Sequence, residues 1–310
     1  MPEEKKKQSL PFFANCLIAG FSGMGAAVFV HPLEVLKFRM QLSGEKGSTV
    51  DHKNSFQAIV NMAKKEKLSG FYGGITANFT RQLVFTSTRI GTYTTLSEKL
   101  KKHGQDTVIN NAIVSMSAGA MAAVIATPTD IAVVRMTADG RLPPESRRNY
   151  KHVFDALHKI HRDEGVKGLW RGTVVTVNRA MVANVTQLMS YDTAKKYLKD
   201  NQNMEEGLKL HTLSSMVSGI MYSVCSNPMD VFKTRIQQQK IIDGKPEYSG
   251  MVDVATTLVK TEGITALWKG WPFYYLRIAP ATVLLFVFME QLNKGYRKYV
   301  LHEEQENKRN

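Results

Sequence analysis

The chain has 310 residues, with 41 lysines and arginines against 27 acidic residues, a net charge of +14 and a mean hydropathy of −0.22. A composition of 43% hydrophobic and 22% charged residues excludes a disordered chain, a collagen and a coiled coil, and two cysteines are too few for a disulfide framework or a cysteine-rich metal site. The average also disfavours a bundle of wholly apolar membrane helices, and the positive charge indicates an anionic partner, which could be nucleic acid, phospholipid or a small anion.

The charges are unevenly distributed along the chain. Three runs contain no lysine, arginine, aspartate or glutamate, namely 8–33, 107–129 and 210–229. Each reaches the length of about 20 residues that a helix needs to cross a bilayer, and each is rich in small residues that let membrane helices pack closely. The alternative is three buried helices of a soluble protein.

Between these runs lie three further apolar stretches of similar length, each interrupted by arginine. They span roughly 74–97, 172–191 and 270–289. A charge near the middle of a spanning helix costs ~2.5–3.5 kcal/mol on insertion scales, so we expect these arginines to face a water-filled interior. The sequence therefore predicts six transmembrane helices.

An internal repeat organises the chain. The stretch 32–39 (PLEVLKFR) recurs at 128–135 (PTDIAVVR) and at 228–235 (PMDVFKTR). Downstream, an aromatic residue followed closely by glycine and then an arginine recur with a step of 98 residues, the arginines being Arg81, Arg179 and Arg277. Such a period is the signature of a repeat architecture.

Each repeat is predicted to contain an apolar helix, a polar loop and an arginine-bearing helix. Within the loops, 52–65, 151–162 and 250–261 have the pattern of short amphipathic helices. Two spans per repeat return the chain to its starting side, so we expect one all-α membrane domain over 1–310, with pseudo-threefold repeats at about 10–104, 105–204 and 205–300. Six helices in a ring can enclose a cavity.

The arginine-bearing stretches are the candidate substrate site. Arg81, Phe85 and Arg89 are spaced to lie on one helical face, and the step of 98 maps Arg89 onto Gln187. Because a guanidinium group is always charged and grips carboxylates with two hydrogen bonds, the pattern favours a dicarboxylate ligand. The alternative is that an arginine only binds backbone carbonyls. The candidate substrate-binding residues are Arg81, Phe85, Arg89, Arg179, Gln187 and Arg277.

The predicted first helix of each repeat contains one proline, and the three are Pro32, Pro128 and Pro228. A proline inside a helix removes one hydrogen bond and kinks the axis. We expect these helices to bend until they converge at one end, where the acids and bases that follow the prolines face each other. The alternative is a solvated helix end.

These motifs resemble those of the mitochondrial carrier family, over about residues 10–300. The stretches 135–143 and 242–248 are, in addition, similar to members that exchange 2-oxoglutarate for malate. The resemblance implies a multi-pass carrier of the mitochondrial inner membrane that exchanges 2-oxoglutarate for malate or related dicarboxylates by alternating access. We further expect a functional monomer that binds no nucleic acid. The sequence has no catalytic constellation and its histidines lack the spacing of metal ligands, so we expect neither an enzyme nor a metal site.

Four alternatives stay open. Within the family the chain could carry dicarboxylate and phosphate, or aspartate and glutamate, or it could act as a proton-leak or uncoupling carrier. Outside the family, a basic soluble repeat protein that binds nucleic acid would use the same net charge. That last reading predicts extraction from membranes without detergent.

The resemblance also assigns a gate on the matrix side, in which Lys37 pairs with Asp230 and Asp130 with Lys233. Val133 stands where the third base belongs. We therefore expect Glu34 to lack its usual partner and the closed gate to be weakened. Two further residues, Gln41 and Gln237, occupy positions where the family braces its ion pairs.

The gate on the cytoplasmic side is incomplete in this sequence. Its family element, an aromatic residue, an acid and a base, is complete only at 191–195. The charged residues that remain are Asp192, Lys195 and Glu290. We expect a weak cytoplasmic gate and a resting state that is open to that side.

The aromatic–basic–glycine element is where the family holds cardiolipin, which we expect to be bound here with no other cofactor. Free N–H groups at a helix start favour a phosphate. The alternative is that the tryptophans only anchor the protein at the bilayer surface. The residues are Trp170, Arg171, Gly172, Trp268, Lys269 and Gly270, with Gly74 alone in the first repeat, which lacks the base.

Overall fold

The computed structural model describes residues 11–44, 55–66, 68–104, 107–140, 147–202, 207–239, 241–242 and 245–298, together with positions 142, 145 and 204. The predicted start of the first amphipathic helix, at 52–54, lies outside these residues, as do the outermost positions of the predicted repeats. Six long helices account for most of the described chain. They are α1 (Phe12–Gln41), α3 (Ile75–Lys102), α4 (Val108–Asp139), α6 (Thr173–Gln202), α7 (Leu208–Gln238) and α9 (Trp271–Tyr296).

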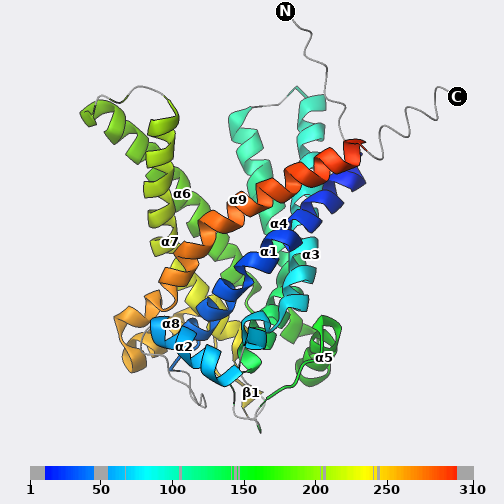
Figure 1. Ribbon diagram of the computed structural model, residues 1–310, viewed down its shortest axis with the longest axis vertical. Helices are drawn as coiled ribbons and strands as arrows, with labels where there is room; N and C mark the ends of the chain where they lie inside the picture. The colour runs from blue at the N-terminus through cyan, green and yellow to red at the C-terminus, as the bar shows by residue number, and fades with distance from the viewer. Residues whose placement is uncertain are drawn as a thin grey trace, which may run out of the picture.

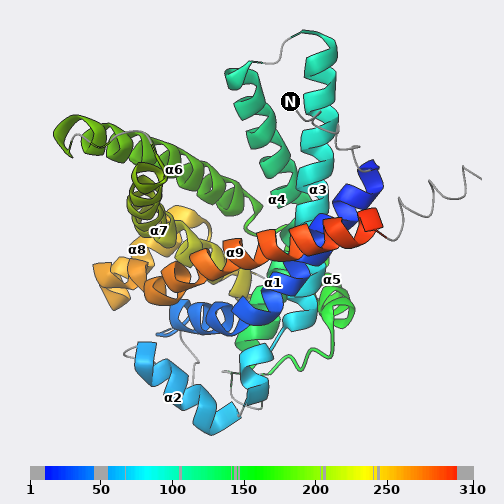
Figure 2. The ribbon, with the colours of Figure 1, turned by 45° about the horizontal axis from the view of Figure 1, so that its top comes forward.

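The long helices are arranged as a splayed bundle (Figures 1 and 2). They converge at one end, here called the closed end, and diverge at the other, the open end, where α1 begins and α9 finishes. Helix α1 packs against both α3 and α9, while α3 packs against α4 and α6 against α7. Contacts between α4 and α6 and between α7 and α9 close the predicted ring of six helices. The helices α1, α4 and α7 also contact one another.

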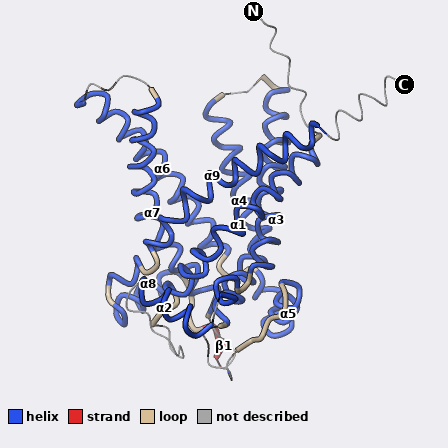
Figure 3. Tube along the Cα trace, in the orientation of Figure 1, coloured by secondary structure: helices blue, strands red, loops and turns tan. Residues whose placement is uncertain are grey.

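Three short helices surround the closed end, and the short connections between helices are visible in Figure 3. They are α2 (Ser55–Glu66), α5 (Val153–Leu169) and α8 (Met251–Glu262), and one-turn 3-10 helices η1 (Leu68–Tyr72) and η3 (Ile264–Trp268) follow α2 and α8. Helix α5 runs past its predicted end because a second turn continues after a break at Gly165, where φ is +70°. The predicted amphipathic helices are therefore present in all three repeats.

The apolar core lies at the closed end, in three equivalent clusters. In each, a short helix packs into the joint between the first helix of its own repeat and the second helix of the preceding one. Helix α2 contributes Ala58 and Met62 to a cluster with Leu36 of α1 and Phe273 of α9. The same arrangement joins α5 to α4 and α3, and α8 to α7 and α6. The short helices thus connect neighbouring repeats.

A pair of two-residue strands, β1 (Ile241–Ile242) and β2 (Lys245–Pro246), is an exception to the all-helical prediction. The strands pair antiparallel, with Ile241 opposite Pro246. They fall in the polar loop after α7 and leave the helical architecture unchanged.

Mean hydropathy selects a different set of membrane-spanning helices from the set that the charge-free runs indicate. Among the described residues, three helical segments are long and apolar enough to cross a membrane, namely Phe12–Gln41, Asn110–Asp139 and Ile264–Tyr296. The third contains Arg277, whereas the charge-free run 210–229 in α7 does not qualify. Helix α7 is rich in serine, while α9 carries a run of leucine, valine and phenylalanine that outweighs one arginine.

Candidate functional site

The site begins with two ion pairs at the closed end. Lys37 Nζ of α1 lies 2.9 Å from Asp230 Oδ2 of α7, and Lys233 Nζ of α7 lies 2.7 Å from Asp130 Oδ2 of α4. Each residue stands two or five positions after a helix proline, which places it on the inner face where α1, α4 and α7 meet. All four side chains are buried or nearly so. Both pairs predicted from the sequence are present.

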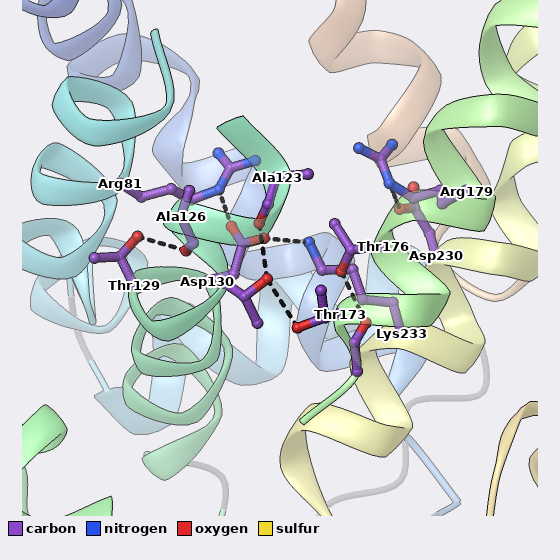
Figure 4. A network of polar contacts seen from close by, with 12 residues as sticks. Arg81, Ala123, Ala126, Thr129, Asp130, Thr173, Thr176, Arg179, Asp230 and Lys233 are labelled. Atoms are coloured by element: carbon purple, nitrogen blue, oxygen red, sulfur yellow. Dashed lines mark hydrogen bonds and ion pairs between the residues drawn. The ribbon is translucent and has the colours of Figure 1, made fainter. Parts of the chain in front are cut away.

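Two of the three arginines in register bind the same carboxylates, Asp130 and Asp230. Arg81 of α3 forms an ion pair and a hydrogen bond with Asp130, and Arg179 Nε of α6 lies 3.3 Å from Asp230 Oδ1. In Figure 4, Arg81 and Lys233 both reach Asp130, and Arg179 lies against Asp230. Sequence reasoning missed these contacts, because it placed the arginines and the acids in separate layers.

Glu34 lacks its usual base, as expected from Val133, but it is paired with two other side chains. Its Oε1 accepts a hydrogen bond of 3.3 Å from Arg277 Nη1 of α9, and its Oε2 accepts one of 2.7 Å from Asn78 Nδ2 of α3. Val133 is buried and packs in the apolar cluster beside α5. A guanidinium and an amide thus replace the missing base.

The amide of Asn78 continues this network to His31, which is fully buried. Asn78 Nδ2 lies 2.9 Å from His31 Nδ1, and His31 Nε2 lies 3.0 Å from the carbonyl oxygen of Gly73. One ring nitrogen therefore donates to a carbonyl while the other accepts from an amide, which is the pattern of a neutral imidazole. The step of 98 maps Asn78 onto Thr176 and Tyr274, so the repeat alone gave no signal for it.

The predicted substrate set divides into two levels. The lower level contains Arg81, whose guanidinium carbon lies 6.0 Å from the centre of the Phe85 ring. The upper level contains Arg89 and Gln187, which line a cavity of about 470 Å³ nearer the open end, together with Tyr191. Five of the six candidates therefore line two successive parts of the interior, Arg81, Arg179 and Arg277 below and Arg89 and Gln187 above.

The two glutamines predicted to brace the ion pairs form no hydrogen bond with them among the described residues. Gln41 Oε1 accepts a hydrogen bond of 2.8 Å from Thr234, and the side-chain amide of Gln237 has no hydrogen-bond partner. The reason is packing, since both side chains lie over glycines at the starts of neighbouring helices, Gln41 over Gly270 and Gln237 over Gly172.

The arginine that ends each proline motif binds the backbone of the first helix of the next repeat. Nε of Arg39 donates to the carbonyl oxygen of Thr137 (3.4 Å), Nε of Arg135 to that of Gln237 (2.9 Å) and Nε of Arg235 to that of Gln41 (3.0 Å). The contacts run from α1 to α4, from α4 to α7 and from α7 back to α1. We call these three hydrogen bonds the arginine ring.

The basic residues of the aromatic–basic–glycine element are held by acids of the short-helix region. Arg171 Nη1 lies 2.7 Å from Glu164 Oε2, and Lys269 Nζ lies 2.6 Å from Glu262 Oε2. The same glutamates also pair with arginines of the ring, Glu164 with Arg135. The bases predicted to face lipid thus have partners within the protein.

The tryptophans of that element bind carbonyl groups that the helix prolines leave unpaired. Trp170 Nε1 donates to the carbonyl oxygen of Val124 at 3.2 Å, and Trp268 Nε1 to that of Val224 at 3.1 Å. Each acceptor lies four residues before a proline, Pro128 or Pro228, and a proline has no N–H to offer it. The indoles therefore replace hydrogen bonds that α4 and α7 lose.

The glycines of the element are required by geometry. Gly74, Gly172 and Gly270 all have φ near +80°, in the left-handed region that favours glycine. A Cβ atom on Gly270 would lie 2.9 Å from the carbonyl oxygen of Lys37. The start of α9 thus packs directly on the backbone of α1.

The cytoplasmic-gate candidates lie apart from this network. Asp192 is exposed, and Glu290 pairs with Lys294 one turn further along α9, at 2.7 Å, with both side chains 65% exposed. Beside them, the Tyr191 hydroxyl lies 2.6 Å from His211 Nδ1 of α7. Within the described part of the chain, no group of three or more histidine, cysteine or acidic residues could hold a metal.

Six long helices in three repeats, converging on buried carboxylates and half-buried arginines, are the architecture of a membrane carrier. Comparison with known proteins specifies the class further. A family profile described as "Mitochondrial carrier protein" matches residues 8–104, 104–202 and 206–300. The chain belongs to this family, and it is a multi-pass protein of the mitochondrial inner membrane.

Individual relatives align over nearly the whole chain. The mitochondrial 2-oxoglutarate/malate carrier protein of Mus musculus is 46% identical over 300 residues, covering 96% of this chain and 95% of the relative. The protein of that name from Caenorhabditis elegans is 44% identical over 293 residues, with 94% and 95% covered. Mitochondrial uncoupling protein 5 of Arabidopsis thaliana is 36% identical, with 90% and 96% covered.

Proposed function

We propose that the chain exchanges 2-oxoglutarate for malate, or a related dicarboxylate, across the mitochondrial inner membrane by alternating access. The observation that carries the proposal is the pairing of each lower-level arginine with one carboxylate, namely Arg81 with Asp130, Arg179 with Asp230 and Arg277 with Glu34. The geometry explains how such a substrate opens the closed end. The chain acts as a carrier and not as an enzyme.

The mechanism is a competition between carboxylates. A bound dicarboxylate presents its own carboxylates to the guanidinium groups, which then release those of the closed end. Asp130 and Asp230 keep their lysines, whereas Glu34 is left with the uncharged Asn78. The closed end therefore loses ion pairs when substrate binds. A ligand shifts a conformational equilibrium only by binding one state better, and this competition supplies such a difference.

The side from which substrate enters follows from the orientation of the family in the membrane, in which the closed end faces the matrix. The site then opens toward the cytoplasm and receives substrate from that side. Arg89 and Gln187 meet the substrate in the upper cavity before it reaches the lower arginines. The ion pairs Lys37–Asp230 and Asp130–Lys233 form the matrix gate.

Lipid binding belongs to the same proposal. The left-handed glycines Gly74, Gly172 and Gly270 open the starts of α3, α6 and α9, whose free N–H groups and dipoles suit the phosphates of cardiolipin. Because Arg171 and Lys269 are paired with glutamates, backbone groups rather than these bases would hold the lipid. A single chain encloses the whole site, which supports a functional monomer that uses small dicarboxylates and no nucleic acid.

The test is uptake of labelled 2-oxoglutarate into liposomes that contain the purified chain, with and without internal malate. We expect uptake only with internal malate, and replacement of Arg81, Arg179 or Arg277 by alanine should abolish it. Arg162→Ala is the matched control, because Arg162 is 67% exposed and pairs only with the adjacent Asp163. The absence of uptake with any internal dicarboxylate would contradict the proposal, and a pH-sensitive dye in the same vesicles tests for a proton leak.

A further inference from the structure

The charged side chains around the lower arginines form one buried group, here called the charge cluster. Eight of them line a single small cavity at the closed end, and the ion pairs described above connect them. Five are cationic and three are anionic: Lys37, Arg81, Arg179, Lys233 and Arg277 against Glu34, Asp130 and Asp230. The net charge of the cluster is therefore +2.

The neighbouring groups do not change this number. His31 donates one ring N–H to a carbonyl and accepts an amide N–H at the other nitrogen, so it is neutral. Glu34 accepts hydrogen bonds from Arg277 and Asn78 and is thereby held as a carboxylate. Arg89 lies two helical turns toward the open end and is exposed, so water screens it from the cluster.

A net charge of +2 is costly at this depth, because uncompensated charge in a low-dielectric interior is poorly solvated. A dianion that enters the cluster brings the total to zero. A monoanion would leave one positive charge, and a trianion would create one negative charge. The cluster is matched to a doubly charged ligand.

One position sets this balance. The base that follows the proline by five residues is Lys37 in the first repeat and Lys233 in the third, but the second repeat has Val133 there. Val133 lines the same cavity as Glu34. A lysine at this position would raise the cluster to +3, and the uncharged Asn78 now occupies the carboxylate that such a lysine would reach.

We propose that Val133, with Asn78 as the neutral partner of Glu34, determines the charge of the transported substrate by fixing the cluster at +2. The proposal rests on dicarboxylate exchange and adds the residue that selects dianions over trianions. Val133 acts through the charge balance of the site and needs no contact with the substrate.

The experiment compares two anions that differ by one carboxylate group, glutarate and tricarballylate, at neutral pH. Each competes with labelled 2-oxoglutarate for uptake into liposomes containing the full chain. In Val133→Lys the preference for glutarate over tricarballylate should fall on the order of tenfold, which is the effect of one unit charge at a separation of about 12 Å and an effective dielectric near 20. Val133→Met, which adds no charge, should keep the preference of the unmodified chain.

A second variant separates charge from geometry. Glu34→Gln also raises the cluster to +3, but it removes an ion pair, whereas Val133→Lys adds one. Both should therefore shift the preference in the same direction. An unchanged preference in either variant would overturn the proposal.

Binding can also be measured without transport, by the thermal stabilisation that each anion gives the purified chain in detergent. This readout keeps the test valid if Val133→Lys folds but does not transport. It also separates the two proposals: if the unmodified chain exchanges no dicarboxylate, the proposed function fails, while the preference for charge is still measured.

Discussion

Replacing Trp170 by phenylalanine removes the N–H that pairs with the carbonyl group of Val124, while an aromatic ring stays in place. A net hydrogen bond within a protein contributes about 1 kcal/mol, and this acceptor lies in a helix that Pro128 has already deprived of its own donor. We expect Trp170→Phe to lower the free energy of unfolding by about 1 kcal/mol, which in a chain of this size lowers the thermal midpoint by roughly 2 °C. The assay is thermal unfolding of the purified chain in detergent at one scan rate.

A double-mutant cycle with Pro128→Ala isolates the hydrogen bond. An alanine at position 128 restores a backbone N–H that can pair with Val124, so the indole is no longer needed there. In that background Trp170→Phe should cost only its lost ring area, and the coupling between the two substitutions should be about 1 kcal/mol. Tyr72→Phe is the matched control, because Tyr72 occupies the same position in the first repeat and stacks on His31 through its ring.

The result that refutes this reasoning is an equal cost of Trp170→Phe in both backgrounds. The tryptophan would then act through packing or the bilayer surface, as the sequence alone allowed. The same cycle with Trp268 and Pro228 repeats the test in the third repeat.

Three further predictions address other parts of the chain. Gly270→Ala should destabilise the chain more than Gly104→Ala. Both glycines have positive φ, but of the two only Gly270 would bring a Cβ atom against backbone, at 2.9 Å from the carbonyl oxygen of Lys37. Equal thermal midpoints for the two variants would contradict this. A hydrogen bond from the Lys151 N–H, and to a smaller extent the Lys159 ammonium, lowers the pKa of Asp155. The stability that the ionised Asp155 gives α5 is therefore present above about pH 4 and is lost as the pH falls through the lowered pKa. Asp155→Asn should remove this acid dependence from amide exchange at the start of α5. Cysteines replacing Asp192 and Glu290, in a chain with Cys16 and Cys225 changed to serine, should cross-link slowly without substrate, and rapid locking would show that the cytoplasmic side is closed at rest.

The fold was predictable because the repeat of 98 residues fixes which segments are equivalent, and equivalent amphipathic segments must occupy equivalent places. The pairs Lys37–Asp230 and Lys233–Asp130 were implied by the resemblance to the mitochondrial carrier family, and the structure contains both of them. Spacing along one helix does not say how far neighbouring helices are shifted along their axes, and so it gave no indication that Arg81 reaches Asp130. That shift depends on how the helices converge at the closed end.

Two further features were hidden in the sequence for different physical reasons. Asn78 aligns with Thr176 and Tyr274, so its role is specific to the repeat that lacks a base and leaves no periodic trace. Arg171 and Lys269 look available to lipid because their partners, Glu164 and Glu262, lie seven residues earlier in the sequence, in α5 and α8. A search for an acid that accompanies each such base would have indicated these pairs.

The arginine ring has a consequence for how mutational scans of this chain are interpreted. Its three acceptors are backbone carbonyl groups, at Thr137, Gln237 and Gln41. No side-chain substitution deletes a carbonyl group, so an alanine scan detects the three donors and passes over the acceptors. The acceptor positions are free to diverge in side chain, as threonine and glutamine already do here, while the contact between neighbouring repeats persists. Chemical replacement of the amide by an ester at these positions, rather than mutagenesis, measures how much the three backbone acceptors contribute to stability.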